Sequence, residues 1–315
     1  MILIHPIYST TKSSLKSINF YIIETDRDLL LLDAGYPTET CWDDLQSELH
    51  RLGYEVTDLS AILLTHHHPD HVGLVNTIRD KVEIPLYVHE KSTSRLRREP
   101  NFMDMRIAFY EQLYRESGCG DVGKEQIQHL LASLDANASQ AIDGELTYVD
   151  VDQSLFGFKV LEVPGHAPDQ IAFQYHDLLI SGDLLIGHIS SNAIVEPNED
   201  GERIQALSQH VQSLQKIANT NVNTVHPGHG SVITDPRALI HERLEGVKRK
   251  TDAIRDLLYT SQHTASDVAK QMYEKRYKSQ FPLVMSEIIG HLDYMEQLHM
   301  VDKEYKHGVY MYSAR

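Results

Sequence analysis

The chain has 315 residues, of which 41% are hydrophobic and 23% charged, and its formal net charge at pH 7 is −16. This is the composition of a globular protein long enough for two domains, and the negative charge gives no general attraction to nucleic acid or anionic membranes. Two cysteines do not make a disulfide framework, and no signal-peptide or membrane-spanning pattern is evident. We therefore expect a cytoplasmic protein with no membrane segment.

Short apolar runs alternate with helical patterns along the first 90 residues. The strands expected there are 18–23, 29–33, 59–65 and 84–88. The helices expected there are 38–52 and 72–80. Thr38 is the predicted N-cap of the first of these helices, and Gly53 is predicted to end it.

Residues 91–142 change to a helical character. Apolar side chains recur at helical spacing at Phe102, Met105, Phe109, Leu113 and Tyr114, and another helix is expected at 125–134. The apolar stripe is either the packed side of a core or lid helix, or an apolar wall over a substrate pocket.

Strands resume after this helical segment. They are expected at 146–149, 158–163, 171–175, 178–181 and 222–225, with an amphipathic helix at 203–218. Strands joined by both hairpins and helices predict α/β layers rather than a purely parallel sheet.

The C-terminal segment, 236–315, is mostly helical and is expected to close with a hairpin at 301–312, which is similar to a winged-helix module. It carries 13 Lys and Arg against 11 Asp and Glu. A surface that follows phosphates normally shows a basic stripe, because counterion release supplies most of the affinity. We therefore expect a structural cap over one side of an active-site cleft, not a nucleic-acid-binding domain.

A cluster of metal-ligand side chains directly follows the apolar run that ends at residue 64. His66, His68, Asp70 and His71 lie within six residues, and imidazole and carboxylate groups suit zinc, iron or manganese. Strand alternation places His66 and His68 on one side and points His67 away, so His67 is not expected to be a ligand. A turn into a helix would bring Asp70 and His71 round to face them. These ligands are enough for parts of two metal sites.

Three later residues extend this pattern. His166, Asp183 and His229 each follow a predicted strand, in turns that contain glycine. Each offers a metal-ligand group at a strand end, so together with the first cluster they predict a metal centre.

With these residues the chain resembles the metallo-β-lactamase superfamily of binuclear metallohydrolases, and within it the glyoxalase II-like branch. The resemblance covers roughly residues 1–235. The matching positions are His66, His68, Asp70 and His71 for the signature, His166, Asp183 and His229 for the later ligands, and Asp33 for the early acidic residue. The distance from His71 to His166 is longer than in compact members, and a helical insertion at about 91–142 would account for it.

The resemblance implies an α/β fold, a four-layer αββα sandwich, that holds two divalent metal ions. Zinc is the expected metal, and iron and manganese are the alternatives. The implied ligands of the first metal are His66, His68 and His166. Those of the second are Asp70, His71 and His229, with Asp183 bridging the two. Asp33 would accept a hydrogen bond from a ligand histidine and fix its orientation.

A hydroxide that bridges the two metals would then attack a small thioester, ester or lactone, with Asp70 orienting the nucleophile and taking up its proton. The expected organisation is a catalytic domain at 1–235 and a winged-helix-like domain at 236–315. The expected partner is a small-molecule substrate, and a homodimer is left open. The alternatives are a phosphodiesterase or ribonuclease of the same superfamily, which lacks support from a basic composition, and a diiron redox protein, which the intact His68 does not favour.

Overall fold

The structure is a computed structural model that describes residues 2–315, and these residues divide into two compact units. The first unit comprises residues up to 97, 140–191 and 213–240, and the second comprises 98–139, 192–212 and 241–315. This geometric grouping does not test the predicted domains, 1–235 and 236–315, which stay predictions. Among the described residues, no helix is both long and apolar enough to cross a membrane.

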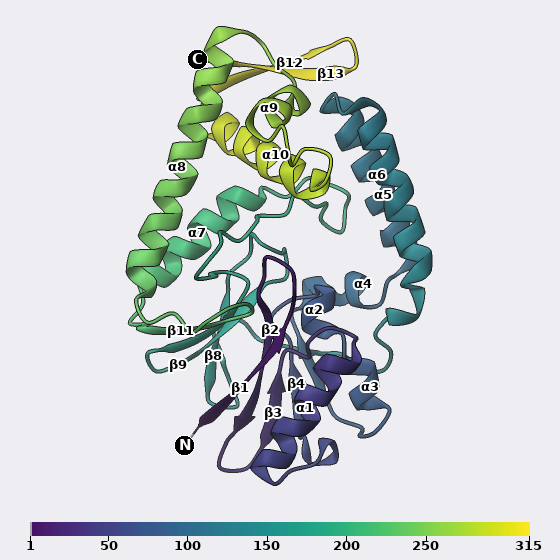
Figure 1. Cartoon of the computed structure of the whole chain (residues 1–315), viewed down its shortest axis with the longest axis vertical. Helices are drawn as coiled ribbons and strands as arrows, with labels where there is room; N and C mark the ends of the chain where they lie inside the picture. Colours follow the sequence, from purple (N-terminus) through teal and green to yellow (C-terminus); the bar gives the residue numbers. More distant parts are fainter. Residues whose placement is uncertain (1) are drawn as a thin grey trace. The chain divides into compact units, whose positions relative to one another are not determined.

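The first unit contains a mixed sheet with the strand order β1-β2-β3-β4-β5-β6 (Figure 1). Its strands are β1 (Leu3–Thr10), β2 (Ser17–Glu24), β3 (Leu29–Leu32), β4 (Ala61–Leu63), β5 (Leu86–Val88) and β6 (Thr147–Tyr148). The first three pair antiparallel, and β3 to β6 pair in parallel. β1 was not predicted, because it is a half-exposed edge strand that contains Pro6 and lacks a clear apolar alternation.

A second sheet in the same unit has the order β11-β10-β9-β8-β7. Its strands are β7 (Ser154–Leu155), β8 (Phe158–Glu162), β9 (Ile171–Tyr175), β10 (Leu178–Gly182) and β11 (Thr224–Pro227). β10 pairs in parallel with β11 and antiparallel with β9, which itself is antiparallel to β8. The carboxyl ends of β8, β10 and β11 therefore lie at one edge of this sheet.

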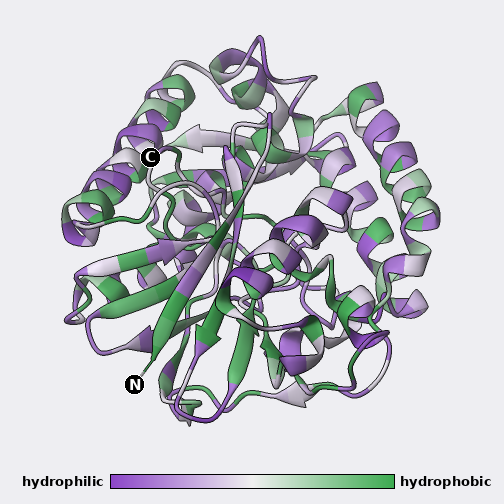
Figure 2. Ribbon diagram, turned by 60° about the horizontal axis from the view of Figure 1, so that its bottom comes forward, coloured by the Kyte–Doolittle hydropathy of each residue, from purple (hydrophilic) through white to green (hydrophobic). Residues whose placement is uncertain are grey.

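The two sheets pack against each other through one buried cluster. Tyr21, Leu32 and Leu63 of the first sheet belong to it, together with Phe158 and Phe173 of the second. Because successive side chains of a strand point to opposite faces, Ile22 and Leu31 instead enter a second cluster with helix α1. The central strands are thus buried on both faces, and they are mostly green, the hydrophobic colour, in Figure 2. The predicted α/β layering is confirmed.

Helix α1 (Glu39–Leu52) begins and ends where the sequence predicts. The Thr38 side chain accepts a hydrogen bond from the amide of Cys41, and Gly53 closes the helix at a φ of 87°. The other helices with residues in this unit are α2 (Pro69–Val72), α3 (Val75–Arg79), α4 (Thr93–Leu96), α7 (Ala206–Ala218) and α8 (Pro236–Thr260).

The helix predicted at 72–80 is present but shorter, as α3, because the helical hydrogen bonding breaks between α2 and α3. The amide of Gly73 donates to the carbonyl of Gly35, and the amide of Leu74 donates to that of Ala34. A Cβ at Gly73 would lie 2.3 Å from the nitrogen of Pro37. Close contact with the loop after β3 therefore replaces the helical hydrogen bonds at this point.

The second unit contains the insertion helices and the C-terminal elements. These are α5 (Pro100–Glu116), α6 (Gly120–Ala136), α9 (Ala265–Met272), α10 (Phe281–Gln297), β12 (Val301–Lys306) and β13 (Val309–Ala314). Leu113 and Tyr114 of the apolar stripe pack in one core with Met285 and Ile288 of α10. This supports the core interpretation of that part of the stripe. The predicted terminal hairpin is present, and the winged-helix class stays a prediction.

We expect His291 of α10 to make this core sensitive to acid. It is 3% exposed, and its Nδ1 lies 3.0 Å from the Oγ1 of Thr251. Burial, reinforced by nearby Lys250, lowers the pKa of His291 to about 4. Between pH 6.5 and 4 the unfolded state therefore binds a proton that the folded state does not. We expect about 3 kcal/mol of stability, fully present above pH 6.5, to be lost as the pH falls to 4.

Urea unfolding of chelator-treated protein at pH 7.5 and pH 4, followed by circular dichroism, checks this expectation. His291→Asn retains an acceptor for Thr251 but cannot titrate, so this variant should lose less stability than wild type over the same interval. Burial also raises the pKa of Asp293 to about 6, which acts with the opposite sign, but it does so in both proteins and cancels in the comparison. Equal losses in the two proteins would contradict the assignment to His291.

Candidate metal centre

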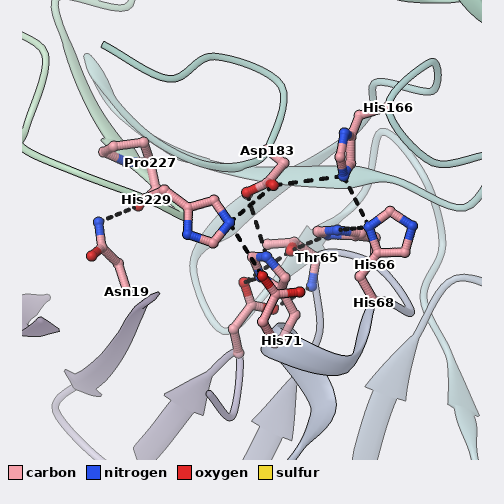
Figure 3. A network of polar contacts seen from close by, with 12 residues as sticks. Asn19, Thr65, His66, His68, His71, His166, Asp183, Pro227 and His229 are labelled. Carbon is pink, nitrogen blue, oxygen red and sulfur yellow. Dashed lines mark hydrogen bonds and ion pairs between the residues drawn. The ribbon is translucent and has the colours of Figure 1, made fainter. Parts of the chain in front are cut away.

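The first group of candidate ligands consists of three histidines from two loops. His66 and His68 follow β4, and His166 lies in the loop between β8 and β9. The Nδ1 of His68 lies 3.0 Å from the Nε2 of His66 and 2.9 Å from the Nε2 of His166. Figure 3 shows the three rings facing one another. Three imidazole nitrogens at this spacing form a group that could hold one metal ion.

The second group lies beside the first. Asp70 and His71 belong to the single turn of α2, and His229 follows β11. The Nε2 of His229 lies 3.4 Å from the Oδ2 of Asp70. The ligand atoms of all three residues lie within 4.8 Å of one another, so they form a second candidate metal group.

Asp183 lies between the two groups, directly after β10. Its Oδ1 is 3.4 Å from the Nε2 of His71, and its Oδ2 is 3.1 Å from the Nε2 of His229. The same Oδ2 is 3.6 Å from the Nε2 of His166, which belongs to the first group. One carboxylate is therefore within reach of both groups. All seven ligand positions predicted from the sequence come together in space.

The polar atoms of this cluster fit a divalent metal ion. Within residues 2–315, the Nε2 atoms of His71 and His229 and the Oδ1 of Asp183 are buried without a hydrogen-bond partner. Leaving a buried polar atom without a hydrogen-bond partner costs roughly 1–3 kcal/mol of stability. A ligand that contacts all three of these converging atoms would remove that cost. Imidazole nitrogens with carboxylate oxygens are a donor set for zinc, iron or manganese.

The electrostatics of the cluster favour the metal-binding protonation state at His66 and Asp183. Burial, reinforced by the neighbouring histidines, lowers the pKa of His66 well below its usual value, which favours the neutral ring. Burial raises the pKa of Asp183, but His229 and His71 outweigh this effect and hold the pKa well below its usual range. At two other ligands the shift is opposite. Burial lowers the pKa of His71, but Asp33 and Asp183 outweigh it and hold that pKa well above its usual value, and Asp183 likewise raises the pKa of His229. Because neutral imidazole and ionised carboxylate are the forms that donate to a metal, a metal would have to displace a proton from these two rings.

Asp33 orients one of these histidines. It follows β3, which is parallel to β4, so the carboxyl ends of both strands lie at the same edge of the sheet. The Nδ1 of His71 donates to the Oδ2 of Asp33 at 2.8 Å, while the amide and hydroxyl of Thr65 also donate to this carboxylate. These contacts aim the Nε2 of His71 into the cluster. Asp33 thus lies where the resemblance implies an acidic residue. Its role toward a bound metal stays a proposal.

A polar stripe on β2, which was not predicted from the sequence, supports His229. The Nδ1 of His229 donates to the carbonyl of Ser17 at 2.8 Å. The side-chain amide of Asn19 donates to the carbonyl of Pro227 (Figure 3) and to that of Gly230. The Tyr21 hydroxyl also donates to the carbonyl of Pro227. Polar side chains at every second position of an otherwise apolar strand were the available signal, because such a stripe must find buried partners.

His67 and Asp169 form a second contact that the sequence did not predict. His67 takes no part in the two groups described above. Its Nδ1 lies instead 2.7 Å from the Oδ1 of Asp169, which is 0% exposed. The signal was an acidic residue placed between a turn at 164–168, which contains two prolines and a glycine, and the buried strand that begins at Ile171.

Comparison with known proteins agrees with this fold and site. A family model described as the metallo-beta-lactamase superfamily matches residues 14–229. The chain belongs to this superfamily, and the predicted fold class is confirmed. The structure of a metallo-beta-lactamase family protein from Thermus thermophilus has the same fold. It superposes with a TM-score of 0.79 at 22% identity and covers 100% of this chain and 98% of that one.

Two named relatives are similar to this chain over most of its length. The chain is 32% identical over 282 residues to the probable metallo-hydrolase YqjP of Bacillus subtilis (strain 168). The matched region covers 88% of this chain and 86% of the relative. The chain is also 25% identical over 241 residues to an atrochrysone carboxyl ACP thioesterase of Aspergillus terreus. This matched region covers 76% of this chain and 57% of the relative. The protein is thus of the metallo-hydrolase type, with a histidine and aspartate cluster as its candidate metal site.

Proposed function

We propose that this protein is a binuclear metal-dependent hydrolase that cleaves a small thioester, ester or lactone. The observation that carries the proposal is the convergence of seven ligand side chains into two groups, with one carboxylate within reach of both. His66, His68 and His166 would hold the first metal ion, and Asp70, His71 and His229 the second. Asp183 would contact both. Zinc is the expected metal, with iron and manganese as alternatives.

When bound, the two cations would supply Lewis acidity toward a carbonyl oxygen and a water molecule of lowered pKa. The chain's own contribution begins with orientation. Asp33 accepts from the Nδ1 of His71, and the Ser17 carbonyl accepts from the Nδ1 of His229, so both rings present Nε2 to the cluster. Ring rotation and the wrong tautomer are thereby excluded at these positions.

Asp70 is the candidate for moving a proton. Its side chain is 21% exposed, whereas those of His71 and His229 are 0% exposed and that of Asp183 is 7% exposed. Among the carboxylates of the cluster, Asp70 is thus the one that solvent and substrate reach most easily. One of its oxygens can orient the attacking water and accept its proton, a role that requires a positioned base at the reacting centre.

A carbon ester is favoured over a phosphodiester by two observations. A relative with similarity over 76% of this chain is named as a thioesterase. The net charge of −16 gives no attraction to polyanions, and a nucleic-acid substrate would require a basic surface. A small neutral or weakly charged acyl compound therefore suits the protein best.

Metal analysis and a hydrolysis panel test the proposal together. The panel should contain acyl thioesters, lactones, p-nitrophenyl esters and bis-p-nitrophenyl phosphate. We expect two metal equivalents per chain and a preference for the carbon esters. Preference for the phosphodiester, or turnover that persists in the metal-free protein, would overturn the proposal.

Metal removal should also change stability. At a free metal concentration of 100 times the dissociation constant, one site stabilises the folded state by about 2.7 kcal/mol. We expect chelator treatment to lower the urea midpoint by a corresponding amount and to abolish turnover, and zinc to restore both. A midpoint that does not respond to zinc would show that the cluster binds no metal in the folded state.

A further inference from the structure

We propose that His67 and Asp169 form a positioning pair that holds together the two loops supplying the three-histidine group. Neither residue belongs to the ligand set proposed above. The inference rests on the proposed function, because it assigns the pair a role in the affinity of the first metal position. The second metal position has supports that do not involve this pair, and one of them, Asp33, also reaches His66 of the first position through the Thr65 hydroxyl.

The place of each residue in the chain is the first argument. His67 lies between the candidate ligands His66 and His68, and Asp169 lies three residues after the candidate ligand His166. A contact between His67 and Asp169 therefore joins the loop after β4 to the loop after β8. These strands belong to different sheets, so the pair bridges the two layers where the three histidines meet.

The chemistry of the contact is the second argument. Asp169 is 0% exposed, the His67 side chain is 10% exposed, and the Nδ1 to Oδ1 distance is 2.7 Å. A carboxylate only accepts, so the Nδ1 of His67 carries the hydrogen and donates it. Hydrogen bonds to an ionised acceptor are short and about twice as strong as neutral ones. The orientation of the His67 ring is therefore tightly held. The backbone that carries the neighbouring side chains of His66 and His68 is held with it.

A buried carboxylate is a costly way to fill space. Replacing a buried ion pair by apolar side chains is often neutral or stabilising, so packing alone does not call for Asp169. A directional contact between the loops requires a hydrogen-bond acceptor such as Asp169, because a hydrogen bond sets both a distance and an angle, whereas apolar packing does not. One backbone hydrogen bond, from the amide of Ile171 to the carbonyl of Thr65, also joins these segments. The side-chain pair adds a second, separate constraint.

The second group has different supports. Asp33 holds His71, and the loop that carries His229 is held by the polar stripe of β2, Ser17, Asn19 and Tyr21. None of these contacts involves His67 or Asp169. Loss of the pair should therefore weaken the first metal position more than the second.

Metal binding to His67→Ala tests the pair without relying on catalysis. Zinc affinity is measured by competition with a chromophoric chelator, and the occupancy of each position by anomalous scattering from crystals equilibrated at limiting zinc. We expect the affinity of the three-histidine position to fall about 10- to 100-fold, the range typical of residues that orient metal ligands. Occupancy of the second position should change much less.

Two further variants separate positioning from general damage. His67→Asn keeps an N–H donor close to the place of Nδ1, so it should bind zinc at the first position with an affinity between those of wild type and His67→Ala. Asp169→Asn keeps the shape and the acceptor but loses the charge, and it should weaken the same position. His129→Ala, an exposed residue of α6, is the matched control and should match wild type. If His67→Ala does not fold, the comparison of His67→Asn and Asp169→Asn with wild type decides the question.

The outcomes are distinguishable from failure of the proposed function. If wild type binds no metal, the proposed function and this inference both fall. If wild type binds two zinc ions and the variants at 67 and 169 bind them with wild-type affinity, only the positioning role is overturned. Equal loss at both positions would also overturn it, because the pair would then not act on the first position in particular.

Discussion

Asp70→Asn is expected to lower kcat/KM for the best ester or thioester substrate by about 10²- to 10⁴-fold, the range typical of a lost general base. The amide has the shape of the carboxylate and retains one oxygen, but it cannot take up a proton. Its oxygen also carries no full charge, so the second metal position should bind zinc more weakly. The measurement is steady-state kinetics at saturating zinc, together with metal content.

The controls for Asp70→Asn separate catalysis from folding. Asp135→Asn changes an exposed residue at the end of α6 in the same way and should leave both kinetics and metal content unchanged. The circular dichroism spectrum of Asp70→Asn should match wild type, because Asp70 is partly exposed and lies outside the buried clusters. A wild-type rate in Asp70→Asn at full metal occupancy would remove Asp70 from the mechanism.

Gly228→Ala is expected to damage the centre without removing any ligand. A Cβ at this position would lie 2.3 Å from the Oδ1 of Asp183 and 2.7 Å from the Cε1 of His71. Both distances are far below contact, so Asp183 or His71 must shift. Overpacking typically costs about 1–3 kcal/mol. If the shift appears as lost metal binding, the affinity of the second position falls roughly 5- to 150-fold.

Zinc titration by chelator competition measures this effect, and turnover should fall in parallel. Gly246→Ala is the matched control, because Gly246 lies inside helix α8 and the nearest atom to its added Cβ is the flexible end of Arg249, at 3.8 Å. That variant should keep wild-type zinc affinity and gain about 0.5–1 kcal/mol of stability from its better helix propensity. Wild-type zinc affinity in Gly228→Ala would show that the centre tolerates a displacement of its ligands.

Predicted helices agree best with the structure where a single residue determines the end of the helix. Thr38 and Gly53 bound α1 as predicted, because a side-chain cap and a positive φ are local properties. The helix predicted at 72–80 is present only from Val75 to Arg79, after a break in the helical hydrogen bonding, for the opposite reason. Its break depends on backbone contacts of Gly73 and Leu74 with the loop after β3, about 40 residues earlier in the chain.

The partition of the chain also depended on tertiary contacts. The helical insertion was recognised as a change of character at residues 91–142, and its two main helices are present. Its shared core with the C-terminal segment was not predictable, because Tyr114 and Phe281 are adjacent only in space. An amphipathic helix shows in its sequence which face it buries, but not which element covers that face.

The sequence by itself determined the chemistry that this protein can offer. Seven residues of two ligand types, histidine and aspartate, lie at or shortly after the ends of apolar strands, and strand ends at one edge of a sheet bring their side chains together. Only the tertiary structure decided how each ligand is held. His229 and Ser17 are 212 residues apart in the chain, and His67 and Asp169 are 102 apart. Local periodicity indicates that a side chain is buried, but hydrogen-bond partners at such separations follow only from the packing of the two sheets.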